Sequence, residues 1–337
     1  MVLQKWDVLR DRIEGCWWGQ MVGDALGSQV EFDSAEALKR RWPYGLRVIG
    51  PSAIWGTAAG QVTDDSEMAI ELLHALTTHD DSVDWDLVAA GYVQWYQSGP
   101  FDSGRTVRRA VRGANRVDQT MSGLADSMRQ NANPDSKANG ALMRQSPIGI
   151  WGFAKDPKIL GDLAREDARL THPNPVCRDA SAVYTATIAQ TIRWGFGPKE
   201  AYQFAREYHA QYGQESDVLE CLDAARDQSP PFSPHIGYVL LALHNAFYQL
   251  LHTETFEEAV VSTVMVGGDT DTNGAIAGAM AGAVYGKANI PQEWAKTLEI
   301  CDFKKGHVVR PSRYLPMAAV DQLNRLMPQL EQQYLTL

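Results

Sequence analysis

Two acidic stretches that lie far apart in the chain carry residue types that hold hard cations. The first is Thr63-Asp64-Asp65-Ser66, and the second is Asp269-Thr270-Asp271-Thr272, which follows two glycines. Carboxylate and hydroxyl oxygens are the ligands that such cations prefer. Each stretch also opens a helical pattern, where an acidic residue beside Ser or Thr commonly serves only as an N-cap. Together, the two stretches predict two helix starts that converge on one metal site.

Two glycine series predict helices that another backbone can approach closely. Within each series a glycine recurs at every fourth residue, which places all of them on one helix face. The series are Gly15, Gly19, Gly23 and Gly27, and Gly274, Gly278, Gly282 and Gly286. Because such a face carries no side chains, another backbone can approach it closely. We expect two buried helices that pack at close range, and in one arrangement they pack against each other. The alternative is that the two glycine-rich helices are unrelated.

Apolar periodicity predicts further helices along most of the chain. They are expected over 64–76, 84–96, 105–116, 176–194, 198–211, 216–226, 237–252, 255–266 and 317–330. Asp64 and Glu67 match a capping box at the start of the first of these helices. Residues 33–60 and 118–138 are expected to be irregular connections, and a further helix is expected to start within 138–144, where free amides can bind an anion.

Five arginines and one histidine could each have either a structural or a functional role. Five arginines fall within one short helix, and a solvated charged face is favoured over a phosphate or partner site. They are Arg105, Arg108, Arg109, Arg112 and Arg116. His172 lies between Thr171 and Pro173 in a rigid turn, and by position alone it is an ordinary turn residue.

Composition excludes several classes of protein. The chain has 337 residues, 45% of them hydrophobic, and a net charge of −10 that argues against binding nucleic acid through a broad basic surface. Its four cysteines lie far apart without metal-binding spacing, which indicates reduced thiols. The N-terminus lacks an apolar signal region, and no segment is apolar for long enough to span a bilayer. We therefore expect a cytoplasmic protein.

Five ordered sequence blocks resemble the ADP-ribosylglycohydrolase family. They run from residue 15 to about 295, and they include both acidic stretches. The blocks are Gly23-Asp24-Ala25-Leu26-Gly27 with Val30-Glu31-Phe32, Gly60 to Met68, Asn139 to Arg144, Thr171-His172-Pro173, and Gly267 to Thr272. The resemblance implies an all-α fold, a compact orthogonal helical bundle forming one domain over residues 1–337. It also implies two divalent cations, Mg²⁺ or Mn²⁺.

The resemblance also implies roles for individual residues. The implied metal ligands are Thr63, Asp64, Asp65, Asp269, Asp271 and Thr272. Glu31 matches a carboxylate near the substrate ribose and the metals, and Asp102 matches the aspartate that serves the arginine side of the substrate. With Asp65 and Asp269, these two acids form the expected catalytic set. Asn139, Gly140 and Met143 are expected to line the ADP-ribose cleft, and His172 to contact the diphosphate.

The implied activity is hydrolysis of the N-glycosidic bond of ADP-ribosyl-arginine in a modified protein, with ADP-ribose as product. One departure concerns the target: nitrogenase-linked relatives carry Asn where this chain has Arg105, which places a cation near the guanidinium. Three alternatives stay open. They are a silent ADP-ribose-binding protein of the same fold, an immunity protein against an ADP-ribosylating toxin, and a metal-dependent phosphohydrolase, because paired aspartates also serve phosphoryl transfer.

Overall fold

Sixteen α-helices and four short 3-10 helices build the computed structural model, which describes residues 3–78, 82–114, 122–230 and 235–337. The expected all-α fold is confirmed, because these ranges contain no strand. The first eight α-helices are α1 Trp6–Gly27, α2 Ala35–Arg41, α3 Asp64–Leu76, α4 Trp85–Gln97, α5 Arg105–Ala114, α6 Leu124–Asn131, α7 Ser146–Trp151 and α8 Pro157–Thr171. The other eight are α9 Pro175–Trp194, α10 Pro198–Tyr212, α11 Ser216–Asp227, α12 Val239–His252, α13 Phe256–Val264, α14 Thr270–Tyr285, α15 Gln292–Glu299 and α16 Pro316–Leu335. The 3-10 helices are η1 Leu142–Arg144, η2 Lys287–Asn289, η3 Phe303–Lys305 and η4 Ser312–Tyr314.

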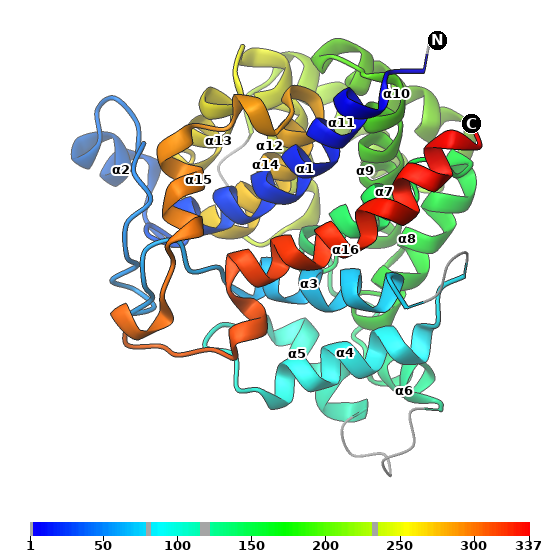
Figure 1. Cartoon of the computed structure of the whole chain (residues 1–337), viewed down its shortest axis with the longest axis horizontal. Coiled ribbons are helices and arrows are strands. Elements are labelled where there is room, and N and C mark those ends of the chain that lie inside the picture. Colours follow the sequence, from blue (N-terminus) through cyan, green and yellow to red (C-terminus); the bar gives the residue numbers. More distant parts are fainter. Residues whose placement is uncertain (1–2, 79–81, 115–121, 231–234) are drawn as a thin grey trace.

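Helices α1 and α14 pack against each other through their glycine faces and form the centre of the fold (Figure 1). A Cβ atom added at Gly23 would lie 1.9 Å from the carbonyl oxygen of Gly274, and one added at Gly19 would lie 2.2 Å from that of Gly278. Both distances are far below van der Waals contact. The two glycine series therefore belong to one interface, and this contact brings Asp269 and Asp271 beside the C-terminal end of α1.

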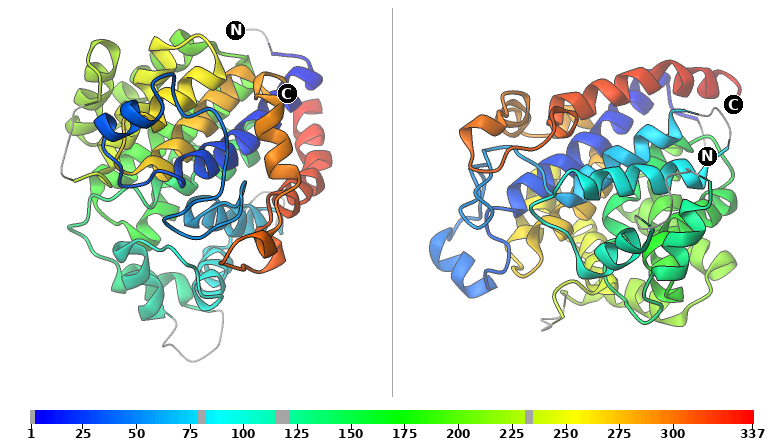
Figure 2. Two further views of the ribbon diagram at one scale, coloured as in Figure 1. Left: turned by 90° about the vertical axis from the view of Figure 1, so that its left-hand side faces the viewer. Right: turned by 90° about the horizontal axis from the view of Figure 1, so that it is seen from below.

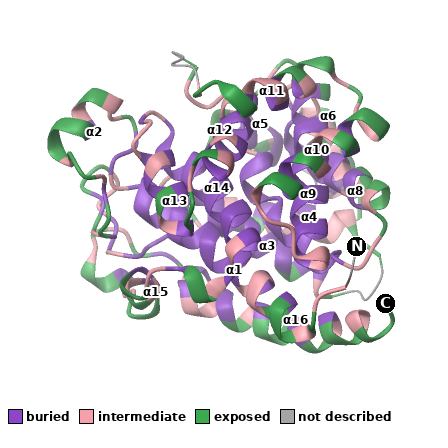
Figure 3. Ribbon diagram, turned by 90° about the horizontal axis from the view of Figure 1, so that it is seen from above, coloured by how far each residue is buried: buried purple, intermediate pink, exposed green. Residues whose placement is uncertain are grey.

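The remaining helices surround this pair, as the two further views in Figure 2 show. Helices α1, α3, α9 and α14 are largely buried, whereas α2 and the outer faces of α15 and α16 are exposed (Figure 3). Helix α16 packs on the outside of α1, where the buried indole of Trp17 donates to the carbonyl oxygen of Ala319. Within the described ranges, no helix combines the length and apolarity that crossing a membrane would require.

Several expected connections are partly helical. Residues 118–138 include α6, because Leu124, Ala125 and Met128 pack inward and Asp86 accepts hydrogen bonds from the backbone at the start of this helix. Residues 33–60 include α2, which Ser34 caps. The helix expected from 138–144 is only the 3-10 turn η1, followed by α7.

The expected capping box is also wrong. Thr63 is the N-cap of α3, but its hydroxyl donates to Asp65, and Glu67 instead bonds the side chains of Arg310 and Trp95. Arg105, Arg108, Arg109 and Arg112 are exposed on α5, as expected of a solvated face, and Arg116 lies outside the described residues. The four cysteines are free thiols, and three of them are buried.

Candidate active site

The first turns of α3 and α14 meet at a buried cluster of acids. Thr63 donates a hydrogen bond from Oγ1 to Oδ2 of Asp65 at 2.7 Å, and the backbone N–H of Thr272 donates to Oδ1 of Asp271 at 2.9 Å. Asp65 and Asp271 are each 1% exposed. The structure therefore brings the two acidic stretches of the sequence together, and these stretches come from helices that contact each other directly.

Asp24 holds the start of α3 in place. Its carboxylate accepts hydrogen bonds from the backbone N–H of Thr63, at 3.0 and 3.1 Å, and from that of Ser66 at 3.1 Å. These are amides that a capping side chain would otherwise satisfy. Asp24 is fully buried on α1. Sequence reasoning missed this role, although a carboxylate between two glycines of a buried helix was a signal that it must have a polar partner.

Glu31 enters the same cluster from the turn after α1. It is 6% exposed, accepts a hydrogen bond from Nε1 of Trp55 at 2.7 Å, and has a carboxylate oxygen within 4.8 Å of one from Asp271. The next residue, Phe32, has a φ of 70°, and its N–H donates to the carbonyl oxygen of Gly268 at 2.7 Å. The turn after α1 is thereby fastened to the glycines that precede Asp269. Trp55, like Asp24, supports the acidic cluster although no local sequence pattern indicated it.

The donor set fits a hard divalent cation. One carboxylate oxygen from each of Glu31, Asp269 and Asp271 lies within 4.8 Å of the others, and the hydroxyls of two threonines border the same cluster. The buried Oδ1 of Asp65 has no hydrogen-bond partner among the described residues. Carboxylates and hydroxyls without nitrogen or sulfur suit Mg²⁺, Mn²⁺ or Ca²⁺. A buried carboxylate oxygen without a partner is costly unless a cation binds it.

The electrostatics of the cluster agree with this fit. Burial raises the pKa of Asp64, Asp65 and Asp271 well above the usual aspartate value, and neighbouring carboxylates raise it further. Burial, followed by the charges of Asp102 and Asp269, raises the pKa of Glu31 to about 8. So many carboxylates cannot all be ionised in one buried cluster without a compensating positive charge.

A cleft of about 520 Å³ opens above the acids. Its lining includes nine of the twelve expected metal, catalytic and substrate-binding residues, namely Glu31, Asp64, Asp102, Asn139, Gly140, Met143, His172, Asp269 and Thr272. Thr63, Asp65 and Asp271 are buried next to this lining. The amide of Asn139 donates to Oδ2 of Asp269 at 2.7 Å, which links the wall of the cleft to its floor.

His172 is buried in the wall of the cleft. Its Nδ1 is hydrogen-bonded to the hydroxyl of Thr171 at 2.8 Å, and its buried Nε2 has no partner among the described residues. Gly140 lies directly against the ring, because a Cβ atom there would be 3.1 Å from Cε1. Burial, and next the charge of Arg144, lower the pKa of His172 to about 3, so the imidazole is neutral at physiological pH.

Asp102 lies on the loop between α4 and α5 and interacts with Asp64 at the edge of the acidic cluster. Burial raises its pKa, and the charge of Asp269 adds to the effect. Arg105 is exposed on the first turn of α5 and lines the same cleft. The largely buried carboxylate of Asp102 and the exposed guanidinium of Arg105 therefore lie on the same side of the cleft.

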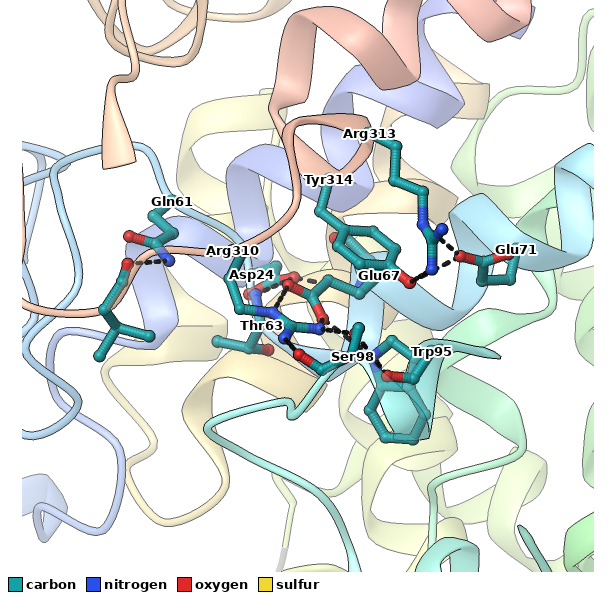
Figure 4. A network of polar contacts seen from close by, with 12 residues as sticks. Asp24, Gln61, Thr63, Glu67, Glu71, Trp95, Ser98, Arg310, Arg313 and Tyr314 are labelled. Carbon is teal, nitrogen blue, oxygen red and sulfur yellow. Dashed lines mark hydrogen bonds and ion pairs between the residues drawn. The ribbon is translucent and has the colours of Figure 1, made fainter. Parts of the chain in front are cut away.

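Residues 307–314, a segment near the C-terminus that we call the strap, contact helix α3 and the segments that carry Trp55 and Asp102. Figure 4 shows Arg310 between Glu67 on α3 and Ser98, whose backbone oxygen accepts from Nη1 at 2.8 Å. The N–H of His307 donates to the carbonyl oxygen of Gly56 at 2.7 Å, beside Trp55. The strap thus bonds helix α3, which carries Asp64, and the loops that carry Trp55 and Asp102.

Comparison with known proteins identifies what this arrangement is similar to. The family model described as ADP-ribosylglycohydrolase matches residues 6–331. The solved structure of an ADP-ribosylglycohydrolase-related protein complex superposes with a TM-score of 0.77 at 25% identity, covering 96% of this chain and 99% of that one.

Curated relatives whose names give an activity align with most of the chain. ADP-ribosyl-[dinitrogen reductase] glycohydrolase of Rhodospirillum rubrum is 28% identical over 296 residues, which cover 87% of this chain and 92% of the relative. ADP-ribosylarginine hydrolase Tri1 of Serratia proteamaculans is 25% identical, with 86% of this chain and 75% of the relative covered. ADP-ribosylhydrolase ARH3 of Homo sapiens is 26% identical, with 86% and 89% covered.

Proposed function

The chain belongs to the ADP-ribosylglycohydrolase family, a family of ADP-ribosyl hydrolases, and from this premise we propose that it removes ADP-ribose from arginine side chains of a modified protein. The observation that carries the proposal is the convergence of the two acidic helix starts with Glu31 beneath one cleft. One relative supports arginine as the linked residue, because it is named an ADP-ribosylarginine hydrolase, and another supports a modified protein as the substrate, because its name gives dinitrogen reductase as the target.

We assign Mg²⁺ or Mn²⁺ to the acidic cluster as the cofactor, with a two-ion site as the finer proposal. The ligands would be Thr63, Asp64, Asp65, Asp269, Asp271 and Thr272. When bound, divalent cations offset the charge of the acids and polarise the oxygens of ribose and water. Asp24 would fix the first ligand group through the backbone of Thr63 and Ser66, and Asn139 would orient Asp269.

The reaction replaces the bond between the anomeric carbon and a guanidinium nitrogen by a bond from that carbon to a water oxygen. Glu31 is the carboxylate proposed to accept the proton of the attacking water, and Trp55 holds it in orientation. Asp102 would bind the guanidinium and control the proton on the leaving nitrogen, since a carboxylate accepts two parallel hydrogen bonds from this group. Neutral His172, with its free Nε2, would donate a hydrogen bond to the diphosphate without adding charge.

The test is cleavage of ADP-ribosyl-arginine peptide by the purified full chain in Mg²⁺ or Mn²⁺. We expect free ADP-ribose and an unmodified peptide, and we expect Asp269→Asn to abolish turnover while far-UV circular dichroism is retained. AMP as the product would instead mean pyrophosphate cleavage. Failure of the wild type to cleave arginine-, serine- and nucleic-acid-linked ADP-ribose, while still binding ADP-ribose, would identify a silent binding protein.

A further inference from the structure

Three aromatic rings form a connected row that begins at Phe32 on the lining of the cleft, and the proposed mechanism assigns a role only to the middle one. The ring centroids of Phe32 and Trp55 are 6.2 Å apart at an interplanar angle of 61°, and those of Trp55 and Phe101 are 5.8 Å apart at 53°. Both separations fall in the range of favourable aromatic pairs. We call Phe32, Trp55 and Phe101 the aromatic rim.

The row connects the two acids that flank the reaction site. Phe32 directly follows Glu31, Phe101 directly precedes Asp102, and the indole of Trp55 donates to Glu31. The rings come from three different connections, after α1, before α3 and after α4. Tertiary structure therefore assembles an aromatic surface between two carboxylates, which is an environment that attracts organic cations.

The conformation of Phe32 also indicates a ligand. Its φ of 70° is the only positive φ of a non-glycine residue in the described ranges, and for a bulky residue this region is strained. The side chain nevertheless remains 58% exposed, so burial does not compensate for the strain. A glycine would adopt the same backbone without strain. An exposed ring kept at a strained position on the lining of the cleft is explained by contact with a bound molecule.

We propose that the aromatic rim is the subsite for the guanidinium of the target arginine, an inference that rests on the proposed arginine-linked activity. A guanidinium is planar and weakly hydrated, so it stacks on aromatic faces while its N–H groups bond carboxylates. The aromatic rim would provide the ring faces on which the guanidinium stacks, and Asp102 would provide the carboxylate that its N–H groups bond. A serine-linked substrate has no cation to place there, so the rim discriminates between linkages.

The first experiment measures binding without turnover. Agmatine, which carries a guanidinium, and N-carbamoylputrescine, which keeps the same ammonium but has an uncharged urea in place of the guanidinium, are titrated by calorimetry into the full chain with Mg²⁺ and ADP-ribose. We expect Phe32→Leu and Phe101→Leu each to weaken agmatine binding about 2- to 5-fold, the effect of one exposed cation–π contact. Binding of the urea should be weaker and should not change. Tyr44→Leu is the matched control, because Tyr44 is 88% exposed and makes no ring contact among the described residues.

A second variant separates folding from binding. Phe32→Gly removes the ring and the strain together, so the Tm should rise while agmatine binding falls. Equal losses for agmatine and the urea, or no loss in any rim variant, would overturn the proposal. If the wild type binds agmatine through the rim but does not cleave arginine-linked ADP-ribose, the proposed activity fails while the guanidinium subsite stands.

Turnover gives a third measurement. In an active enzyme, kcat/KM for arginine-linked substrate should fall in Phe32→Leu and Phe101→Leu, whereas kcat/KM for serine-linked substrate should not. A parallel loss on both linkages would show that the rings only pack the rim.

Discussion

The guanidinium of Arg310 bonds both carboxylate oxygens of Glu67, through Nε at 2.8 Å and Nη2 at 2.7 Å, and both side chains are 1% exposed. The pair fastens the strap to α3, one turn from Asp64 (Figure 4). Because neither charge can be solvated after its partner is lost, the pair matters more than any ion pair on the surface.

Arg310→Met should therefore lower the free energy of unfolding by about 3–5 kcal/mol, the cost of leaving a buried charge unpaired. Urea unfolding measures the loss. Arg10→Met removes one partner of the pair with Glu14, in which the Arg10 side chain is 54% exposed, and it should cost less than about 1 kcal/mol. The double variant Arg310→Met with Glu67→Gln should lose less than the sum of the two single variants. A loss below about 1 kcal/mol in Arg310→Met would contradict this account.

Asp24→Ala should weaken Mn²⁺ binding by about 10- to 100-fold, as for other groups that orient metal ligands from behind. The carboxylate touches no substrate, but it fixes the backbone of Thr63 and Ser66 on either side of Asp64 and Asp65. Calorimetric titration with Mn²⁺ measures the effect, and circular dichroism controls for folding. Asp24→Asn keeps one acceptor oxygen and should lose less. Unchanged Mn²⁺ affinity in Asp24→Ala would show that Asp24 only supports the packing of α1.

The features that were predictable from the sequence depend on local spacing. The glycine series has a helical period, and the acidic stretches each occupy a single helical turn, so neither needs a tertiary neighbour to be recognised. The meeting of Asp65 with Asp269 needs two tertiary contacts, that of α1 with α14 and that of Asp24 on α1 with the start of α3. Family resemblance, and not spacing, indicated Glu31, Asp102 and His172.

What escaped prediction depends on partners far away in the chain. Trp55 became visible only through its bond to Glu31, and the role of Glu67 only through Arg310, which is 243 residues away. The capping box failed for the same reason, since Asp24 supplies what a local cap would have supplied. Helices α2 and α6 were missed because helices of seven and eight residues are marginal by themselves and are stabilised by packing.

Gly23→Ala should destabilise the fold even though alanine is the better helix former. The added methyl group would lie 1.9 Å from the carbonyl oxygen of Gly274, and backbone on both sides leaves it no room to move. We expect a loss at or above the usual 1–3 kcal/mol of overpacking, about 3 kcal/mol or more in thermal or urea unfolding. Gly197→Ala is the control, because its methyl group would meet only the mobile carboxylate of Glu200. A stabilised Gly23→Ala variant would exclude the close helix contact.

Asp179 should stabilise the fold at neutral pH and lose this effect in acid. Burial alone would raise its pKa, but hydrogen bonds from His209, Arg165 and the backbone of Gln214 and Glu215 outweigh it and lower the pKa to about 2. Because the folded value lies below the unfolded one, the contribution is complete above about pH 4 and is lost as the pH falls through about 2. It amounts to about 2 kcal/mol.

The measurement compares unfolding of wild type and Asp179→Asn between pH 7 and pH 2. The difference in unfolding free energy should shrink steadily below about pH 4, the unfolded value. Asp162→Asn is the matched control, since Asp162 is half exposed and binds the same arginine, Arg165. A difference that is independent of pH would mean that Asp179 acts through its shape and not through its charge.

The last prediction concerns Asp102 and Arg105, which share one side of the cleft and carry opposite charge. If Asp102 binds the guanidinium and controls the leaving proton, Asp102→Ala should lower kcat/KM for arginine-linked substrate by about 10²- to 10⁴-fold, and that for serine-linked substrate much less. In that case the exposed Arg105 would repel the same guanidinium through solvent. Arg105→Asn should therefore raise kcat/KM for the arginine linkage by about 5-fold, which corresponds to ~1 kcal/mol between exposed like charges.

This gain should diminish as salt screens the repulsion. Arg112→Asn is the matched control, because Arg112 is exposed on the same helix but does not line the cleft. It should leave both substrates unaffected. Equal losses on both linkages in Asp102→Ala would leave Asp102 as a structural residue of its loop. A lower rate on arginine-linked substrate in Arg105→Asn would mean that Arg105 binds an anionic part of the substrate, such as the diphosphate, instead of opposing the guanidinium.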